Sequence, residues 1–238
     1  MERHSNFSET DKHKTNLKTG TLTLQTEGFF IIMCIYTKQI MFPKELITAV
    51  EFLNTLTIQI AEGHEDGRVN SIADEDTIID LLAEKYGDAI QKPVAREWWD
   101  VKIYGYPVNI KSSAFKNAAD NFSSKAAILY ALTDLPENKV KVQRWQTFEN
   151  LLKTHNKDNN RDYYIIALDK TTGECHLQSL KSLEKLTSNG NNLPFQIKWK
   201  DNVTPVTRTH RQAYEFIVEC YKDSVRKKIS SHDGFENL

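Results

Sequence analysis

The alternation of apolar and polar residues is sharpest over residues 96–113, where it predicts a β-hairpin. Two runs with the period-2 pattern of half-buried strands flank a break at residues 105–107, whose glycine allows a positive φ angle. The apolar positions of the two runs are Val101, Ile103, Val108 and Ile110. Because successive side chains point to opposite faces of a strand, Asn109 and Lys111 share the polar face of the second run. Asp100, on the polar face of the first run, is expected beside them.

Helices are predicted on both sides of this hairpin, where apolar positions recur with a helical period. They span residues 42–62, 74–86, 118–132, 141–155 and 207–228. A loop is expected over residues 63–71, and the second helix carries acids in its first turn, which suits the helix dipole. Further strands are predicted over residues 162–168, 175–180 and 195–199. This order of elements predicts an α/β fold, a central mixed β-sheet flanked by helices.

The chain of 238 residues is expected to form one domain over residues 28–238. Residues 1–27 are predicted to be a disordered extension or a mis-annotated leader, so that Met1, Met33 and Met41 all stand as candidate starts. The most apolar run, residues 28–36, is interpreted as a buried strand, because a bilayer crossing needs about 20 residues.

Composition and charge narrow the class of protein. The formal net charge is −1, so the chain lacks the global basic field of a nonspecific nucleic-acid coater, although a local basic cleft remains compatible with it. The three cysteines have neither disulfide nor zinc spacing, and a reducing cytoplasm is the expected compartment. The expected protein is therefore cytoplasmic and not a membrane protein.

The polar face of the hairpin carries the candidate chemistry. An acid, an amide oxygen and an ammonium group suit metal-assisted phosphodiester hydrolysis, with Mg²⁺ as the expected cofactor, since hard cations take oxygen ligands. A bound metal lowers the pKa of water and neutralises charge on phosphoryl oxygens. A nearby lysine can orient that water and add positive charge.

The spacing Asp-x8-Asn-x-Lys, formed by Asp100, Asn109 and Lys111, resembles the motif of the PD-(D/E)XK nuclease superfamily. The downstream segments 111–113, 119–121 and 125–130 look like type II restriction endonucleases of that superfamily, and the resemblance covers roughly residues 67–228. The chain departs from the family in carrying Asn109 where an acid is usual. Trp99 also stands where proline is usual before the first acid.

The resemblance implies a restriction-endonuclease-like core and a Mg²⁺-dependent, site-specific cleavage of double-stranded DNA that leaves 5′-phosphates. It also implies a homodimer acting on a palindrome, within a restriction–modification system. Asp100, Asn109 and a further acid would hold the metal. Nuclease families of this kind often draw that acid from the helix before the hairpin, where Glu75 fits best because Ile78, Ile79 and Leu82 follow it on one helix face. Glu97 is the alternative, because it lies close to Asp100 along the chain.

Cations near the C-terminus are candidate DNA contacts. Lysines hold phosphates and an arginine can read guanine, so a cluster of such residues could bind DNA. The candidates are Lys198, Lys200, Arg208, His210 and Arg211.

A different class of function stays open. Asn109 also fits a non-catalytic nucleic-acid or protein interaction domain on a degenerate nuclease scaffold, which would not bind Mg²⁺. A serine hydrolase has little support, because the sequence has no Gly-x-Ser-x-Gly motif. The sequence also lacks a glycine-rich phosphate loop, so no nucleotide cofactor is expected.

Overall fold

The computed structural model describes residues 42–56, 58 and 67–231, and within 67–71 only the backbone. These residues belong to one compact unit that begins at Phe42. The predictions made for residues 1–41, namely the N-terminal extension, the buried strand at residues 28–36 and the choice of start, lie outside the described residues.

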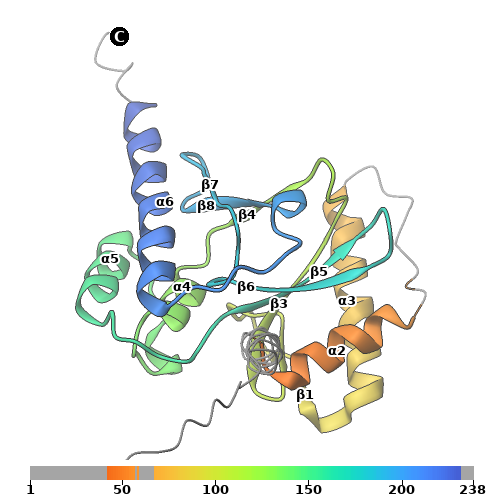
Figure 1. Ribbon diagram of the computed structural model, residues 1–238. Helices are drawn as coiled ribbons and strands as arrows, with labels where there is room; N and C mark the ends of the chain where they lie inside the picture. Colours follow the sequence, from red (N-terminus) through yellow and green to blue (C-terminus); the bar gives the residue numbers. More distant parts are fainter. Residues whose placement is uncertain (1–41, 57, 59–66, 232–238) are drawn as a thin grey trace, which may run out of the picture. The chain divides into compact units, whose positions relative to one another are not determined.

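The predicted central mixed sheet is confirmed, and the fold is α/β (Figure 1). The five-stranded sheet has the order β1-β2-β3-β5-β6, in which β3 and β5 are parallel and the other neighbours are antiparallel. Its strands are β1 (Ile90–Gln91), β2 (Val101–Ile103), β3 (Tyr106–Ser113), β5 (Tyr164–Asp169) and β6 (Cys175–Ser179). A separate antiparallel sheet has the order β4-β8-β7 and consists of β4 (Ala119–Phe122), β8 (Phe195–Lys198) and β7 (Thr187–Ser188).

Helices pack on both faces of the five-stranded sheet. The α-helices are α2 (Lys44–Asn54), α3 (Gly67–Tyr86), α4 (Lys125–Leu132), α5 (Trp145–Thr154) and α6 (His210–Ser230), and the short 3₁₀ helices are η1 (Gly87–Ala89), η2 (Glu137–Lys139) and η3 (Trp199–Asp201). Among the described helices, none is both long enough and apolar enough to cross a membrane.

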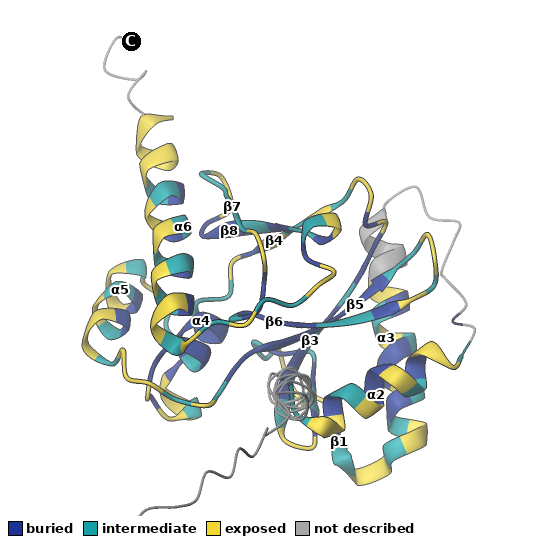
Figure 2. Cartoon of the chain, in the orientation of Figure 1, coloured by how far each residue is buried: buried dark blue, intermediate teal, exposed yellow. Residues whose placement is uncertain are grey.

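Two hydrophobic cores follow from the alternation along β3 and β5 (Figure 2). Val108, Ile110 and Ile166 are fully buried in the core formed with α2 and α3. Ile165 and Ala167 point the other way, into the core that α4, α5, α6 and β8 share. The strand at β5 is therefore buried on both faces, as its apolar sequence predicts.

The predicted hairpin is confirmed, but its turn lies at Tyr104 and Gly105, both of which have positive φ angles, instead of at residues 105–107. Pro107 lies inside β3, at a position paired only with β2, before the pairing with β5 begins at Val108. β2 ends its pairing at Val101, whereas β3 continues to Ser113. The second half of β3 consequently has one edge that β2 leaves open.

Two predictions at the N-terminal side of the hairpin are wrong. The helix predicted over residues 42–62 ends at Asn54, where the Thr55 hydroxyl donates to the Phe52 carbonyl oxygen (2.7 Å). The loop predicted over residues 63–71 already belongs to α3 from Gly67 onward, so the acids near residue 75 lie within the helix and not in its first turn. The polar residues at the start of α3 lack the helical spacing of apolar positions that would predict a helix there.

Three further boundaries differ. The helix predicted over residues 118–132 includes β4, because residues 119–122 pair with β8, a contact that local sequence cannot reveal. α5 begins at Trp145 instead of residue 141. α6 begins at His210, because Thr209 and Gln212 form a capping box that fixes the helix start.

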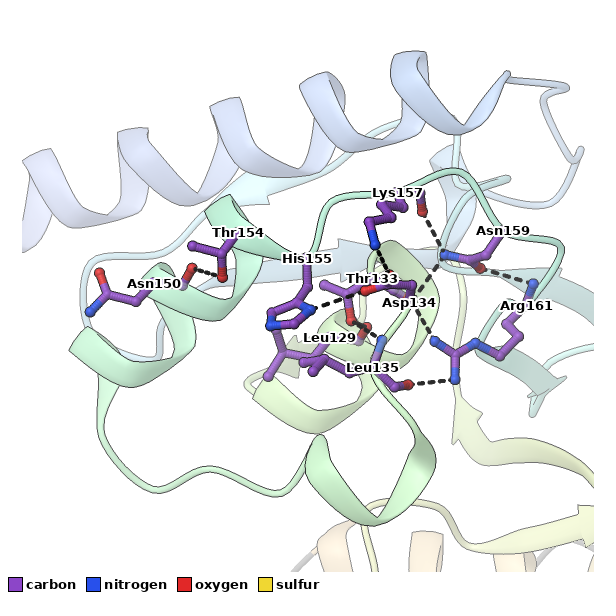
Figure 3. A network of polar contacts seen from close by, with 10 residues as sticks. All are labelled: Leu129, Thr133, Asp134, Leu135, Asn150, Thr154, His155, Lys157, Asn159 and Arg161. Atoms are coloured by element: carbon purple, nitrogen blue, oxygen red, sulfur yellow. Dashed lines mark hydrogen bonds and ion pairs between the residues drawn. The ribbon is translucent and has the colours of Figure 1, made fainter.

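A polar network ties the end of α4 to the segment before β5 (Figure 3). The Arg161 guanidinium donates to the carbonyl oxygens of Thr133 and Leu135 (2.7 Å to Leu135). Asp134 accepts from His155 (3.1 Å) and forms an ion pair with Lys157 (2.7 Å). The Arg161 bonds satisfy two carbonyl oxygens just after the end of α4, and the Asp134 contacts join the same segment to the residues that follow α5.

A buried ion pair anchors α3 to the sheet. The Asp74 carboxylate, fully buried, accepts from the Ser112 hydroxyl (2.7 Å) and pairs with the Lys170 ammonium (2.7 Å). Ser112 lies on β3, so this contact fixes the middle of α3 against that strand. Glu75, the next residue of α3, is thereby placed at the strand's open edge.

Replacing Asp74 with Ala should lower the free energy of unfolding by about 3–5 kcal/mol, because Lys170 would keep a poorly solvated charge without its partner. Chemical denaturation of the full chain measures this. Asp80→Ala is the matched control on the same helix: its pair with Lys92 is exposed at both ends, so its effect should stay within about 0.5 kcal/mol. Equal effects of the two substitutions would contradict the anchoring role.

Candidate active site

The open edge of β3 is closed by a side chain instead of a strand. Asp100 immediately precedes β2, and its backbone N–H donates to the Val108 carbonyl oxygen (3.0 Å). Its carboxylate then accepts the backbone N–H of Ile110 (2.8 Å). The carboxylate thus takes the hydrogen bond that a continuing β2 would have made, which fixes its position.

Lys111 completes the same edge. Its ammonium group donates to the carbonyl oxygen of Ile110 (2.8 Å) and pairs with the Glu75 carboxylate (3.1 Å). The Lys111 and Glu75 side chains are 26% and 22% exposed, so the pair is largely, but not fully, removed from solvent. An ammonium group held from two sides is a positive charge in a defined position.

Asn109 lies on the same face of β3 as Lys111, as the alternation predicts, and its amide nitrogen donates to Asp100 (2.5 Å). The four predicted catalytic residues are therefore brought together. All four line one cavity of about 780 Å³. Residues that also contribute to its wall include Arg96, Glu97, Trp98, Trp99, Asn121 and Tyr163.

Burial raises the pKa of both acids above the ordinary values. For Asp100, burial outweighs the opposing effects of Lys111 and of the Ile110 N–H. For Glu75, burial again comes first, Lys111 opposes it, and the charges of Asp100 and Asp120 raise the pKa further. Burial disfavours the charged form of both carboxylates, and a nearby cation would favour it.

The donor atoms fit a hard cation. Asp100 and Glu75 each use one carboxylate oxygen in the hydrogen bonds above, and the second oxygen of each has no hydrogen bond within the described residues. In the part of the chain that the structure describes, no group of three Asp, Glu, His or Cys side chains could hold a metal. Mg²⁺ commonly takes one or two carboxylates and completes its shell with water and substrate phosphate, so Asp100 and Glu75 are the residues that would hold it.

The two remaining candidates near the hairpin have other contacts. Asn109 is expected as a metal ligand. Its amide N–H₂ donates to Asp100, so only its carbonyl oxygen could bind a metal. Glu97, the alternative acid, lines the cavity but pairs with Lys141. Of the two acids weighed as the further ligand, Glu75 has the direct contact with the motif lysine.

Tyr163 was missed by the sequence reasoning. Its side chain is buried in the cavity wall and its hydroxyl donates to the Trp98 carbonyl oxygen (2.8 Å). Burial and the charge of Asp100 raise its pKa well above the ordinary value, so it stays a neutral donor. No sequence signal marks it, because a tyrosine beside an apolar strand is an ordinary core residue.

The predicted DNA contacts are separated by the fold. Arg208 turns inward: its guanidinium donates to the carbonyl oxygens of Leu183, Lys181 and Glu184 and lies over the Phe216 ring (4.1 Å). The His210 side chain is 7% exposed and contacts Asn156 (3.2 Å). Arg211 is exposed and pairs with Glu215 along α6 (2.8 Å).

Lys198 and Lys200 lie elsewhere, at the end of β8. They surround a small hollow together with Lys116, which the sequence did not single out. The five predicted contacts therefore do not form one cluster, and Lys198 and Lys200 share their surface with Lys116, which comes from a different part of the chain.

No protein-family model matches the chain, and a search of curated proteins finds none similar to it.

Arg208→Ala should destabilise the protein by about 1–3 kcal/mol, because several carbonyl groups would lose a charged donor. Arg211→Ala, which removes the same charge from an exposed helix pair, should change the stability by less than about 0.5 kcal/mol. Thermal unfolding of both variants checks this. A stable Arg208→Ala protein with weakened DNA binding would instead restore Arg208 as a DNA contact.

Proposed function

We propose that the protein is a Mg²⁺-dependent, site-specific endonuclease of double-stranded DNA. The observation that carries the proposal is the convergence of Glu75, Asp100, Asn109 and Lys111 in one cavity, with Lys111 held between Glu75 and the backbone of β3. This is the grouping that the resemblance to restriction endonucleases implies, and it joins residues that lie far apart in the sequence.

The chain's own residues have distinct roles. A metal held by Asp100 and Glu75 would supply an activated water and neutralise charge on the phosphoryl oxygens. Lys111 orients the attacking water and stabilises the negative charge that develops at phosphorus. The water oxygen loses one proton to the solvent and bonds to phosphorus, the bond to the 3′ oxygen breaks, and that oxygen takes up one proton from the solvent. The products are a 5′-phosphate and a 3′-hydroxyl.

The proposal also implies an oligomeric state and a biological role. Cleavage of both strands of a palindrome requires two active sites related by two-fold symmetry, which a homodimer provides. An enzyme of this type acts in the cytoplasm, within a restriction–modification system.

A non-catalytic nucleic-acid or protein interaction domain is the second candidate, and Asn109 favours it. Its amide N–H₂ satisfies Asp100 without a metal. An acid at this position would repel Asp100 unless a cation lay between them. A site stable without metal is what a degenerate scaffold would retain.

The proposal is tested by cleavage of unmethylated phage DNA with Mg²⁺, comparing the intact chain with Lys111→Ala. Discrete fragments are expected from the intact chain, with cleavage at least about a hundredfold slower in the variant, the scale of losing one positioned electrostatic group. Lys92→Ala is the matched control, because Lys92 lines the same cavity but pairs with Asp80. It should stay within a few-fold of the intact chain.

Two other outcomes of this cleavage assay would change the proposed function or the location of its active site. Fragments that persist in Lys111→Ala would keep the nuclease but place its chemistry away from the hairpin. The absence of cleavage by the intact chain, with Mn²⁺ also tried, would favour the interaction domain.

A further inference from the structure

The three-stranded sheet has two unlike faces. Its register pairs Asp120 with Ile197 and Phe122 with Phe195, and these four side chains point inward. Phe122, Phe195 and Ile197 are buried in the hydrophobic core. The alternate pairs point the other way, and they are Ala119 with Lys198 and Asn121 with Gln196. We call the side that carries these alternate pairs the outer face of the β4-β8-β7 sheet.

Amide groups occupy the middle of the outer face. The Asn121 carbonyl oxygen accepts from the side-chain amides of Gln196 (2.9 Å) and Asn189 (3.0 Å). These bonds orient the amides. The Asn121 N–H₂ and the Gln196 carbonyl oxygen make no further hydrogen bond with the described residues. Amide groups of Asn and Gln are side-chain groups that read base edges in the major groove.

Lysines gather at one end of the same face. Lys116, Lys198 and Lys200 line a hollow of about 180 Å³ whose floor includes Ala118 and Ala119. None of them has an ion pair within the described residues, whereas the nearby Lys185 pairs with Asp201 (3.8 Å). Like charges brought together without a carboxylate repel one another, and a polyanion would relieve that repulsion.

The outer face continues into the candidate active site. Ala119, at the start of β4, lines the lysine hollow, while Asn121 and Phe122, at its end, line the 780 Å³ cavity. A strand rises about 3.3 Å per residue, so the two ends of β4 lie about 10 Å apart. That is about three nucleotides along one strand of a duplex, at about 3.4 Å each.

We propose that duplex DNA binds to this outer face, so that its backbone reaches from the lysine hollow to the candidate active site. Lys116, Lys198 and Lys200 hold phosphates of the backbone, and Asn121 with Gln196 face the bases. The inference rests on the proposed nuclease function and deepens it, because it assigns the partner's contact surface. It replaces the cluster at the start of α6, where Arg208 binds backbone carbonyl groups and Arg211 pairs with Glu215.

Binding measured apart from cleavage tests the lysines. Fluorescence anisotropy of a labelled random-sequence duplex, with Ca²⁺ in place of Mg²⁺, gives the affinity of the full chain as a function of salt. The triple variant Lys116→Ala, Lys198→Ala, Lys200→Ala should bind at least tenfold more weakly at low salt. Its salt slope should fall by about 2.7, the value for three phosphate contacts.

The matched control removes the same charge elsewhere. Lys44, Lys139 and Lys153 are exposed and have no ion pair in the described residues, so their triple Ala variant should keep the slope of the intact chain. Equal losses in the two triple variants would overturn the inference, since only net charge would then matter. So would the absence of duplex binding by the intact chain, or a lysine-dependent binding that single-stranded RNA or an acidic peptide competes for better than duplex DNA.

Cleavage assays on the same variants distinguish a failure of this inference from a failure of the proposed function. A lysine-dependent affinity without any cleavage would support DNA binding by the outer face and contradict the proposed nuclease activity. If the outer-face triple variant keeps both the cleavage and the affinity of the intact chain, the nuclease activity would be supported and DNA binding by the outer face would be contradicted.

The amides make a separate prediction. Asn121→Ala with Gln196→Ala should leave affinity for random-sequence DNA and its salt slope within about twofold, while the preference for the cleaved site over random sequence falls about tenfold or more. Circular dichroism verifies that the double variant folds. An unchanged site preference would contradict a base-reading role for this pair.

Discussion

The candidate site depends on one feature of the sheet: β2 begins only at Val101, so it pairs with the first half of β3 alone. β3 runs on to Ser113 with an edge that no strand covers, so the backbone N–H and carbonyl oxygen of Ile110 need other partners. Asp100 takes the N–H and Lys111 takes the carbonyl oxygen. The requirement to satisfy one exposed peptide edge therefore fixes an acid and an ammonium group beside each other. α3, held by the buried Asp74, adds Glu75 from the opposite side of that edge.

The sequence predicts this site better than it predicts the surfaces around it. Alternation within the hairpin is a local property, so Asn109 and Lys111 could be placed on one face and Asp100 beside them. The helical spacing of Ile78, Ile79 and Leu82 likewise placed Glu75 toward the core, and those residues are buried. In these cases neighbours along the chain determine which way a side chain points.

Contacts between distant segments could not be predicted in the same way. The sequence predicts a helix where β4 lies, because the pairing of β4 with β8 depends on residues far along the chain. Arg208 and Lys198 looked equivalent as nearby cations. Backbone carbonyl groups hold Arg208, whereas Lys198 is half-buried and lines a hollow with Lys116. Only the fold determines this difference. Charge in a sequence indicates a possible contact, whereas the availability of that charge depends on the folded structure.

The central claim is that Asp100 and its neighbours form a cation site, and the direct measurement is the thermal stability of Asn109→Asp with and without Mg²⁺. The added acid would lie beside Asp100 in place of a donating amide. Without metal, repulsion should lower the melting temperature below that of the intact chain. With saturating Mg²⁺, the variant should gain more than the intact chain, since a ligand that binds only the folded state stabilises it. A Mg²⁺ response absent from both proteins would contradict the claim.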